Sequence, residues 1–224
     1  MEEMVIKLKN EIGNIFKKQQ NDRINQYKHL NKLSIKGEIL FTGSSLMEHF
    51  PVNELLMNKG INKIVYNRAV GGFTTNDLLD HMEEMVFGVE PSKIFINIGT
   101  NDIGASNYLL DNLIKNYKII LMKIKERLPE TNVYVMAYYP INEVAKENKE
   151  EWERETFKTR TNNNIKIANK AVEELAKSMG YKYIDVNSGL TDENGRLKAE
   201  YTIEGIHMYS NAYNVILDNM IKYL

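Results

Sequence analysis

Apolar residues gather in five short runs along the chain, and each run is rich in Ile, Val, Phe and Tyr. The runs do not alternate strictly between apolar and polar positions, which is typical of strands buried on both faces of a sheet. We therefore predict five strands, at Glu38–Thr42, Lys63–Tyr66, Lys93–Ile98, Val133–Ala137 and Tyr181–Val186.

Between and after these runs, apolar residues recur with the period of an amphipathic helix. The predicted helices are Asn76–Phe87, Leu109–Arg127, Asn163–Met179 and a segment from about Ser210 to the end of the sequence. Gly180 follows the third of them and fits a helix C-cap. Strands that alternate with helices predict a parallel sheet with helices on both sides. We expect an α/β fold of three layers (α/β/α), flavodoxin-like, with a five-stranded parallel sheet of order 2-1-3-4-5.

A further helical pattern lies ahead of the first strand, over about residues 3–30. Its apolar face carries Met4, Leu8, Ile12, Ile15 and Phe16. We expect this face to pack on the outside of the domain, with membrane or partner binding as the alternative. We predict a single domain over residues 1–224, made of a helical extension at 1–36 and a core at 37–224.

Residues 141–160 interrupt the alternation of strands and helices. They are highly charged and hold the only tryptophan, Trp152. We expect a solvated, partly helical excursion after the fourth strand, and a flap over the functional site is the alternative.

Composition and charge narrow the classes of function. The 224 residues carry 29 Lys+Arg against 30 Asp+Glu, and this balance argues against binding of nucleic acid or of an anionic membrane. The sequence has no cysteine, which excludes disulfides, thiolate nucleophiles and Cys-based metal sites. The histidines lack metal-site spacing and no nucleotide-binding loop occurs, so we expect no metal and no cofactor. With no membrane-spanning apolar run and no signal region, we expect a cytoplasmic protein.

Small, polar and turn-forming residues follow the carboxyl ends of the predicted strands. Strand one leads into residues 43–45, strand two into 67–75 and strand three into 99–102. Open parallel sheets bind ligands at this edge, and strands two, one and three are neighbours in the proposed order. A turn-rich stretch after strand five leads to residues 204–207. We expect these segments to form one site.

Together these residues supply the groups that acyl transfer needs. A serine hydroxyl becomes a nucleophile when a base accepts its proton, which the imidazole of His207 can do. The carboxylate of Glu204 can fix the imidazole tautomer and stabilise its charge. Three donors can hold a tetrahedral oxyanion: the backbone N–H groups of Ser45 and Gly72, and the side-chain amide of Asn101.

In their order along the chain, these segments resemble the SGNH hydrolases, also called GDSL-type esterases and lipases. That family places a serine after strand one, a glycine after strand two, an asparagine in Gly-x-Asn-Asp after strand three, and Asp-x-x-His near the C-terminus. The matching positions here are Ser45, Gly72, Asn101 and His207. The resemblance covers roughly residues 37–224 and implies a flavodoxin-like domain, metal-independent ester hydrolysis and a serine acyl-enzyme.

The sequence departs from that pattern at two positions. Ser44 stands where the family has an aspartate before its nucleophile, so Ser44 is the alternative nucleophile to Ser45. Glu204 stands where the family has an aspartate three residues before the histidine, and its extra methylene must fold back to reach the ring. Asp192 is the alternative acid.

We predict a hydrolase of carboxylic ester bonds: a serine esterase that cleaves short-chain acyl esters, acetyl esters among them. The predicted catalytic residues are Ser45, His207 and Glu204, and the predicted oxyanion hole is formed by Ser45, Gly72 and Asn101. The expected partner is a small-molecule acyl ester, and homo-oligomerisation stays open. The alternatives are a lysophospholipase or acyl thioesterase of the same family, and a non-catalytic flavodoxin-like binding module.

Overall fold

The centre of the molecule is a five-stranded parallel sheet of order β2-β1-β3-β4-β5, which confirms the predicted topology. A computed structural model describes residues 2–224, leaving aside the side chains of residues 2, 3, 5, 6 and 9. The strands are β1 (Ile39–Gly43), β2 (Val65–Asn67), β3 (Lys93–Asn97), β4 (Asn132–Met136) and β5 (Lys182–Ile184). Every predicted strand is present, and its ends differ from the prediction by at most two residues.

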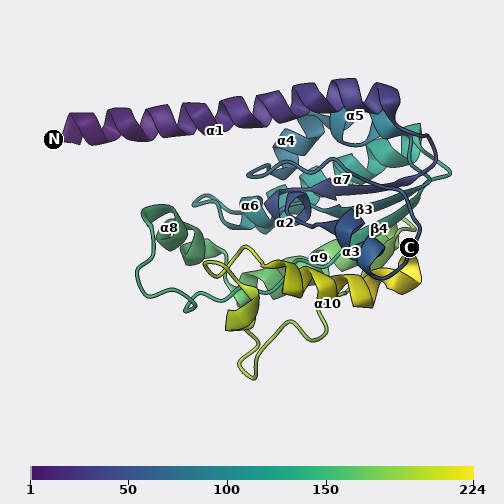
Figure 1. The fold of residues 1–224 in the computed structure, drawn as a ribbon. Helices are drawn as coiled ribbons and strands as arrows, with labels where there is room; N and C mark the ends of the chain where they lie inside the picture. Colours follow the sequence, from purple (N-terminus) through teal and green to yellow (C-terminus); the bar gives the residue numbers. More distant parts are fainter. Residues whose placement is uncertain (1) are drawn as a thin grey trace.

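Helices cover both faces of the sheet and complete three layers (Figure 1). Leu40 and Ile94 face the layer that contains α1 (Glu2–Leu30), α4 (Thr75–Asp80), α5 (Met82–Met85), α7 (Leu110–Arg127) and α9 (Asn162–Ser178). Phe41 and Phe95 face the opposite layer, which contains α2 (Ser45–Glu48), α3 (Val52–Asn58) and α10 (Ser210–Met220). Because both faces of the strands are buried, the strands appear in the sequence as unbroken apolar runs.

Three of the four helices predicted after the first strand are confirmed as α7, α9 and α10. Gly180 follows α9 with a φ of +80°, which confirms its role at the end of that helix. A 3-10 turn at Ile221–Tyr223 replaces the last turn of the predicted C-terminal helix.

The fourth prediction, one continuous helix over Asn76–Phe87, is wrong. A capping box between Thr74 and Asp77 starts α4. The helix ends at His81, whose φ of −123° lies outside the helical region, and α5 and a 3-10 turn at Phe87–Val89 follow. The apolar spacing could not reveal this break, because apolar residues on both sides of it are buried in the same cluster.

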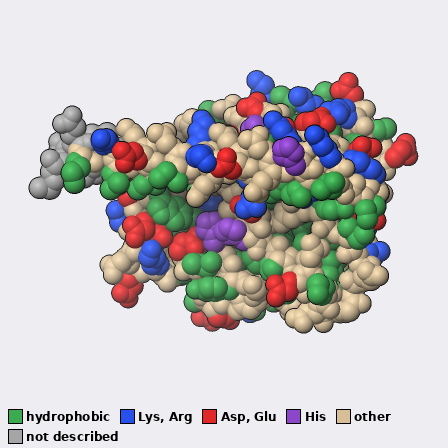
Figure 2. Space-filling view, turned by 45° about the horizontal axis from the view of Figure 1, so that its top comes forward, with side chains coloured by type: hydrophobic (Ala, Val, Ile, Leu, Met, Phe, Trp, Pro, Cys, Tyr) green, Lys and Arg blue, Asp and Glu red, His purple; other side chains and the backbone are tan. Residues whose placement is uncertain are grey.

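The helix α1 packs on the molecule from Phe16 to its C-terminal end. Ile24 and Tyr27 are buried there, whereas the N-terminal half projects beyond the sheet (Figure 1). The predicted apolar face is exposed at Met4 (77%), Leu8 (57%), Ile12 (58%), Ile15 (59%) and Phe16 (49%). The helix lies on the outside of the domain as predicted, but its apolar face ahead of Phe16 does not pack, and hydrophobic side chains gather on the surface along this half of α1 (Figure 2). Within residues 2–224, no helix has the length and apolarity needed to cross a bilayer.

Residues 141–160 follow β4 and contain α8 (Glu151–Thr159), which confirms the prediction that this segment is partly helical. The segment is not simply solvated, because Glu153 and Arg160 are buried. Glu153 accepts a hydrogen bond from Lys146 over 3.0 Å, and Arg160 donates to the carbonyl of Thr100, three residues after β3. A flap role for this segment stays a prediction.

Candidate active site

Ser45 lies where β1 ends and α2 begins. The turn between them is tight, because Gly43 adopts a φ of +154° and a Cβ there would overlap the carbonyl oxygen of Asn97. Ser44 is the N-cap of α2 and Ser45 is its first helical residue. The first N–H groups of a helix have no intrahelical acceptor, so the N–H of Ser45 is available to a ligand.

The structure brings Ser45, His207 and Glu204 together, although Ser45 and His207 are 162 positions apart in the sequence. The Nε2 atom of His207 lies 2.9 Å from Oγ of Ser45. Its Nδ1 atom lies 2.5 Å from Oε1 of Glu204. A hydroxyl, an imidazole and a carboxylate thus form a continuous hydrogen-bonded relay, which is the geometry that activates a serine nucleophile.

The turn between Thr202 and His207 accommodates the extra methylene of Glu204. The hydroxyl of Thr202 accepts from the N–H of Gly205 and donates to the carbonyl of His207, which closes the turn. The carboxylate folds back and accepts from the backbone N–H of His207 over 3.0 Å as well as meeting its ring. Burial opposes ionisation, but the hydrogen bonds and charge of His207 outweigh it and hold the pKa of Glu204 below its usual value. Glu204 is therefore ionised at neutral pH.

The two alternative residues lie elsewhere. Ser44 is fully buried, and its Oγ lies 3.5 Å from Oγ1 of Thr100. Asp192 accepts from the backbone N–H groups of Asn194 and Arg196, so its carboxylate closes its own turn. The structure therefore places Ser45 and Glu204, and neither alternative, against His207.

The predicted oxyanion donors Gly72 and Asn101 are connected to Ser45 through one loop. A Cβ on Gly71 would lie 3.7 Å from Cβ of Ser45, and the amide of Asn101 donates to the carbonyl of Phe73 over 2.9 Å. The loop of residues 71–73 thus lies between Ser45 and Asn101. Within the described residues, no hydrogen bond occupies the N–H of Ser45 or of Gly72, so both can donate to a developing oxyanion.

The side chain of Asn101 is oriented by Arg160, a residue that the sequence did not single out. Arg160 donates to Oδ1 of Asn101 over 3.1 Å and to the carbonyl of Thr100 over 2.8 Å. Because a guanidinium can only donate, this contact fixes the amide oxygen and leaves the amide NH2 to donate to the carbonyl of Phe73. Burial lowers the pKa of Arg160 to about 10, against the opposing charges of Glu204 and Asp102. The guanidinium therefore stays positive at neutral pH, behind the proposed oxyanion hole.

We expect Asn101→Ala to lower kcat by roughly 10²- to 10³-fold with little change in KM, because one oxyanion donor acts mainly in the transition state. Steady-state hydrolysis of a p-nitrophenyl ester measures both constants. Asn163→Ala is the matched control, since Asn163 is exposed on α9. A rise in KM alone would assign Asn101 to ground-state binding instead.

Two further features near the site escaped the sequence reasoning. His49 is the C-cap of α2, four positions after Ser45, and its ring centroid is 5.3 Å from that of His207. Burial and the neighbouring ring of His207 lower the pKa of His49.

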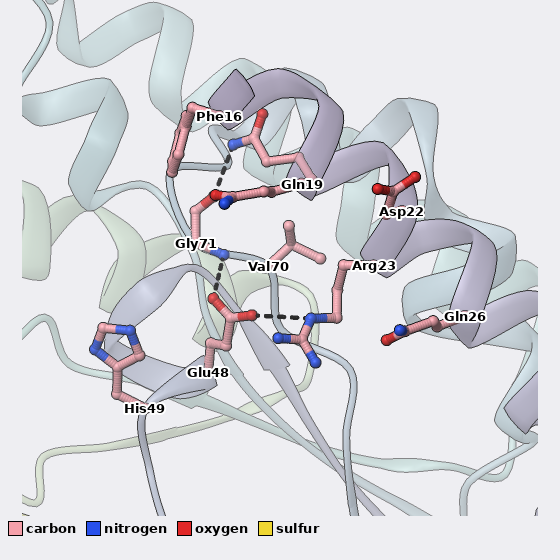
Figure 3. Close-up of a pocket in the computed structure, with 10 residues that line it drawn as sticks. Phe16, Gln19, Asp22, Arg23, Gln26, Glu48, His49, Val70 and Gly71 are labelled. Carbon is pink, nitrogen blue, oxygen red and sulfur yellow. Dashed lines mark hydrogen bonds and ion pairs between the residues drawn. The ribbon is translucent and has the colours of Figure 1, made fainter. Parts of the chain in front are cut away.

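A cavity of about 650 Å³ opens between α1 and α2 (Figure 3). Its lining is mostly polar and includes His49, Glu48, Arg23 and Gln20.

The fold and this constellation define a class of protein, the α/β/α hydrolases of carboxylic esters. Residues 51–215 match the GDSL-like lipase/acylhydrolase family, and the chain belongs to that family. The match contains Gly72, Asn101, Glu204 and His207, and it begins after Ser45. This membership agrees with the resemblance that the sequence motifs indicated.

Individual relatives extend the comparison. A structure from Streptococcus pneumonia, described provisionally as a platelet activating factor, is 31% identical, with a TM-score of 0.84 over 98% of each chain. N-acylneuraminate cytidylyltransferase of Escherichia coli is 25% identical over 88% of this chain, which spans only 42% of that relative's length. An acetylxylan esterase from Geobacillus stearothermophilus shares the fold, at 16% identity and a TM-score of 0.62 over 84% of this chain and 94% of that one.

Proposed function

We propose that this chain is a serine esterase that hydrolyses short-chain acyl esters through an acyl-enzyme. The observation that carries the proposal is the relay in which His207 lies 2.9 Å from Oγ of Ser45 and 2.5 Å from Glu204. Family membership supports ester hydrolysis as the class of reaction.

In the proposed mechanism, Oγ of Ser45 attacks the ester carbonyl while Nε2 of His207 accepts the hydroxyl proton. The N–H groups of Ser45 and Gly72 and the amide of Asn101 donate to the oxyanion. Collapse of the tetrahedral intermediate breaks the C–O bond, and the imidazolium gives its proton to the leaving alcohol. Water then attacks the acyl-enzyme with His207 as base, which releases the acid and restores Ser45.

The cavity between α1 and α2 adjoins the site through His49 and Gly71, although neither Ser45 nor His207 lines it, and its polar side chains favour a polar leaving alcohol. Carboxylate, guanidinium, imidazole and amide side chains line it, and apolar side chains contribute only Phe16 and Val70. Such a lining can hydrogen-bond to a hydroxyl-rich leaving group and offers little wall to a long hydrocarbon chain.

A second candidate, an acylhydrolase for longer chains such as a lysophospholipase, is favoured by one specific observation. Phe16 lies over Gly72, because a Cβ there would be 2.7 Å from its ring. Exposed Ile12 and Ile15 continue an apolar stripe along α1 from that point. A long acyl chain bound along this stripe would bury apolar surface.

Two measurements test the proposal. A fluorophosphonate probe reacts only with an activated hydroxyl, so we expect it to label the wild-type chain and not Ser45→Ala; absence of labelling would favour a non-catalytic binding module. Rates on p-nitrophenyl acetate, butyrate, octanoate and laurate then compare acyl lengths, and we expect kcat/KM to fall beyond butyrate. A rate that rises up to laurate would favour the second candidate. Acetylated sugars belong on the panel because one protein of similar fold is an acetylxylan esterase.

A further inference from the structure

One face of α1 binds the loop that carries the proposed oxyanion donor Gly72. Gln20 donates to the carbonyl of Gly71 over 2.7 Å, and the hydroxyl of Tyr27 donates to the carbonyl of Ala69 over 2.7 Å. Arg23, between them on the helix, pairs with Glu48 at 3.3 Å. Positions three, four and seven apart share one helix face, so this stripe of α1 follows the loop. Figure 3 shows Arg23 of this stripe and Gly71 of the loop.

The Gly71 residue is held from both sides. Oε2 of Glu48 accepts its N–H over 2.8 Å, and Gln20 binds its carbonyl from the side of α1. Arg23 connects the two sides, because it orients the Glu48 carboxylate from α1. This hydrogen-bonding uses side chains of α1 and α2 only and involves no side chain of the loop itself.

The hydrogen bond from Gln20 also sets the direction of the N–H of Gly72. The carbonyl of Gly71 and the N–H of Gly72 belong to one peptide unit, which is planar and trans, so the two groups point in opposite directions. A donor that holds the carbonyl towards α1 therefore holds the N–H away from α1. That N–H has no hydrogen-bond acceptor within the described residues.

An external hydrogen bond is needed here because the peptide joins two glycines. Neither flanking residue has a Cβ to limit rotation, and Gly72 already has a φ of +77°. A flip of this peptide would replace the N–H donor with the carbonyl oxygen of Gly71, which would repel a developing oxyanion.

We propose that Gln20 is a positioning residue for the oxyanion hole: it fixes the Gly71–Gly72 peptide in the orientation in which the Gly72 N–H can donate. The inference rests on the proposed function. It gives α1 a role in the reaction, although α1 lies outside the residues that match the family.

The test compares Gln20→Leu and Gln20→Glu with wild-type enzyme on p-nitrophenyl acetate. Leucine removes the donor, and glutamate keeps the shape but donates only when protonated. We expect roughly tenfold lower kcat for Gln20→Leu with KM within about twofold, the size of effect of one partly exposed hydrogen bond. For Gln20→Glu, we expect the ratio of its kcat to that of wild type to rise as the pH falls through the carboxyl pKa. Asn25→Leu, an exposed position on the same helix, is the control and should keep wild-type kcat.

The other possible results of these experiments distinguish a failure of the Gln20 inference from a failure of the proposed function. Wild-type kcat in Gln20→Leu, an equal loss in Asn25→Leu, or a change in KM alone overturns the role of Gln20. If Gln20→Leu does not fold, a Gln20→Glu variant whose kcat ratio is flat with pH overturns it as well. If Ser45→Ala abolishes hydrolysis while both Gln20 variants remain fully active, only the inference fails. If Ser45→Ala remains active, the proposed function fails.

Discussion

Ser45→Ala is expected to lower kcat by roughly three or more decades while the fold stays intact, because the substitution removes the hydroxyl oxygen that forms the acyl-enzyme in the proposed mechanism. The residual rate comes from the oxyanion donors and from substrate binding, which remain. The methyl group of alanine fits the site, since Ser45 is partly exposed at the start of α2. Steady-state hydrolysis and a burst of p-nitrophenol measure the effect, and thermal unfolding checks the fold.

Ser44→Ala is the matched control, because it removes the same atom from the adjacent residue. Oγ of Ser44 is fully buried and faces Thr100 rather than His207, so we expect hydrolysis to stay within about tenfold of wild type. The reverse pattern, with activity lost in Ser44→Ala and kept in Ser45→Ala, would make Ser44 the nucleophile. Near-normal rates in both variants would remove the serine mechanism.

The sequence was sufficient to predict where most of the proposed site lies. Ser45, Gly72 and Asn101 each follow a buried strand, and parallel strands in the order 2-1-3 bring their carboxyl ends to one edge. His207 does not follow a strand directly: it comes after the turn-rich stretch behind the fifth strand, and its spacing from Glu204 resembles the Asp-x-x-His pattern of the family. The assignment therefore combined topology with a local motif.

The residues that orient the proposed donors could not be found in this way. Gln20 reaches Gly71 across 51 positions and Arg160 reaches Asn101 across 59, and neither contact leaves a periodic or local pattern. Arg160 lies in a segment whose charge indicated a solvated loop, yet tertiary packing buries it. The opposite error occurs on α1. Its apolar spacing predicted a buried face, but Leu8 and Ile12 are exposed because the helix extends past the sheet (Figure 1).

Helix boundaries show a third limit of sequence reasoning. Thr74 and Asp77 form a capping box that starts α4. The helical spacing of buried residues continues past His81, although the helix itself ends there. Backbone geometry at one residue ended the helix, and the apolar pattern contains no information on that geometry when both sides stay buried.

His207→Ala is expected to reduce kcat about as much as Ser45→Ala, because a hydroxyl without its base is not a nucleophile at neutral pH and the two residues act as a unit. The double variant Ser45→Ala with His207→Ala should therefore be no slower than either single variant. Multiplied losses in the double variant would show that the two residues act independently.

Glu204→Gln should reduce kcat less than His207→Ala does, and we expect the two losses to differ by roughly one to two decades. Oε1 of the glutamine can still accept from Nδ1–H, so the imidazole keeps its tautomer, but the negative charge that stabilises the imidazolium is lost. The pKa of Glu204 is held below its usual value by His207, so this charge is present throughout the neutral range and lost only as the pH falls through that lowered pKa. Steady-state kcat at neutral pH measures the difference, with exposed Glu200→Gln as the matched control. Equal losses in Glu204→Gln and His207→Ala would show that the carboxylate is as indispensable as the base it orients.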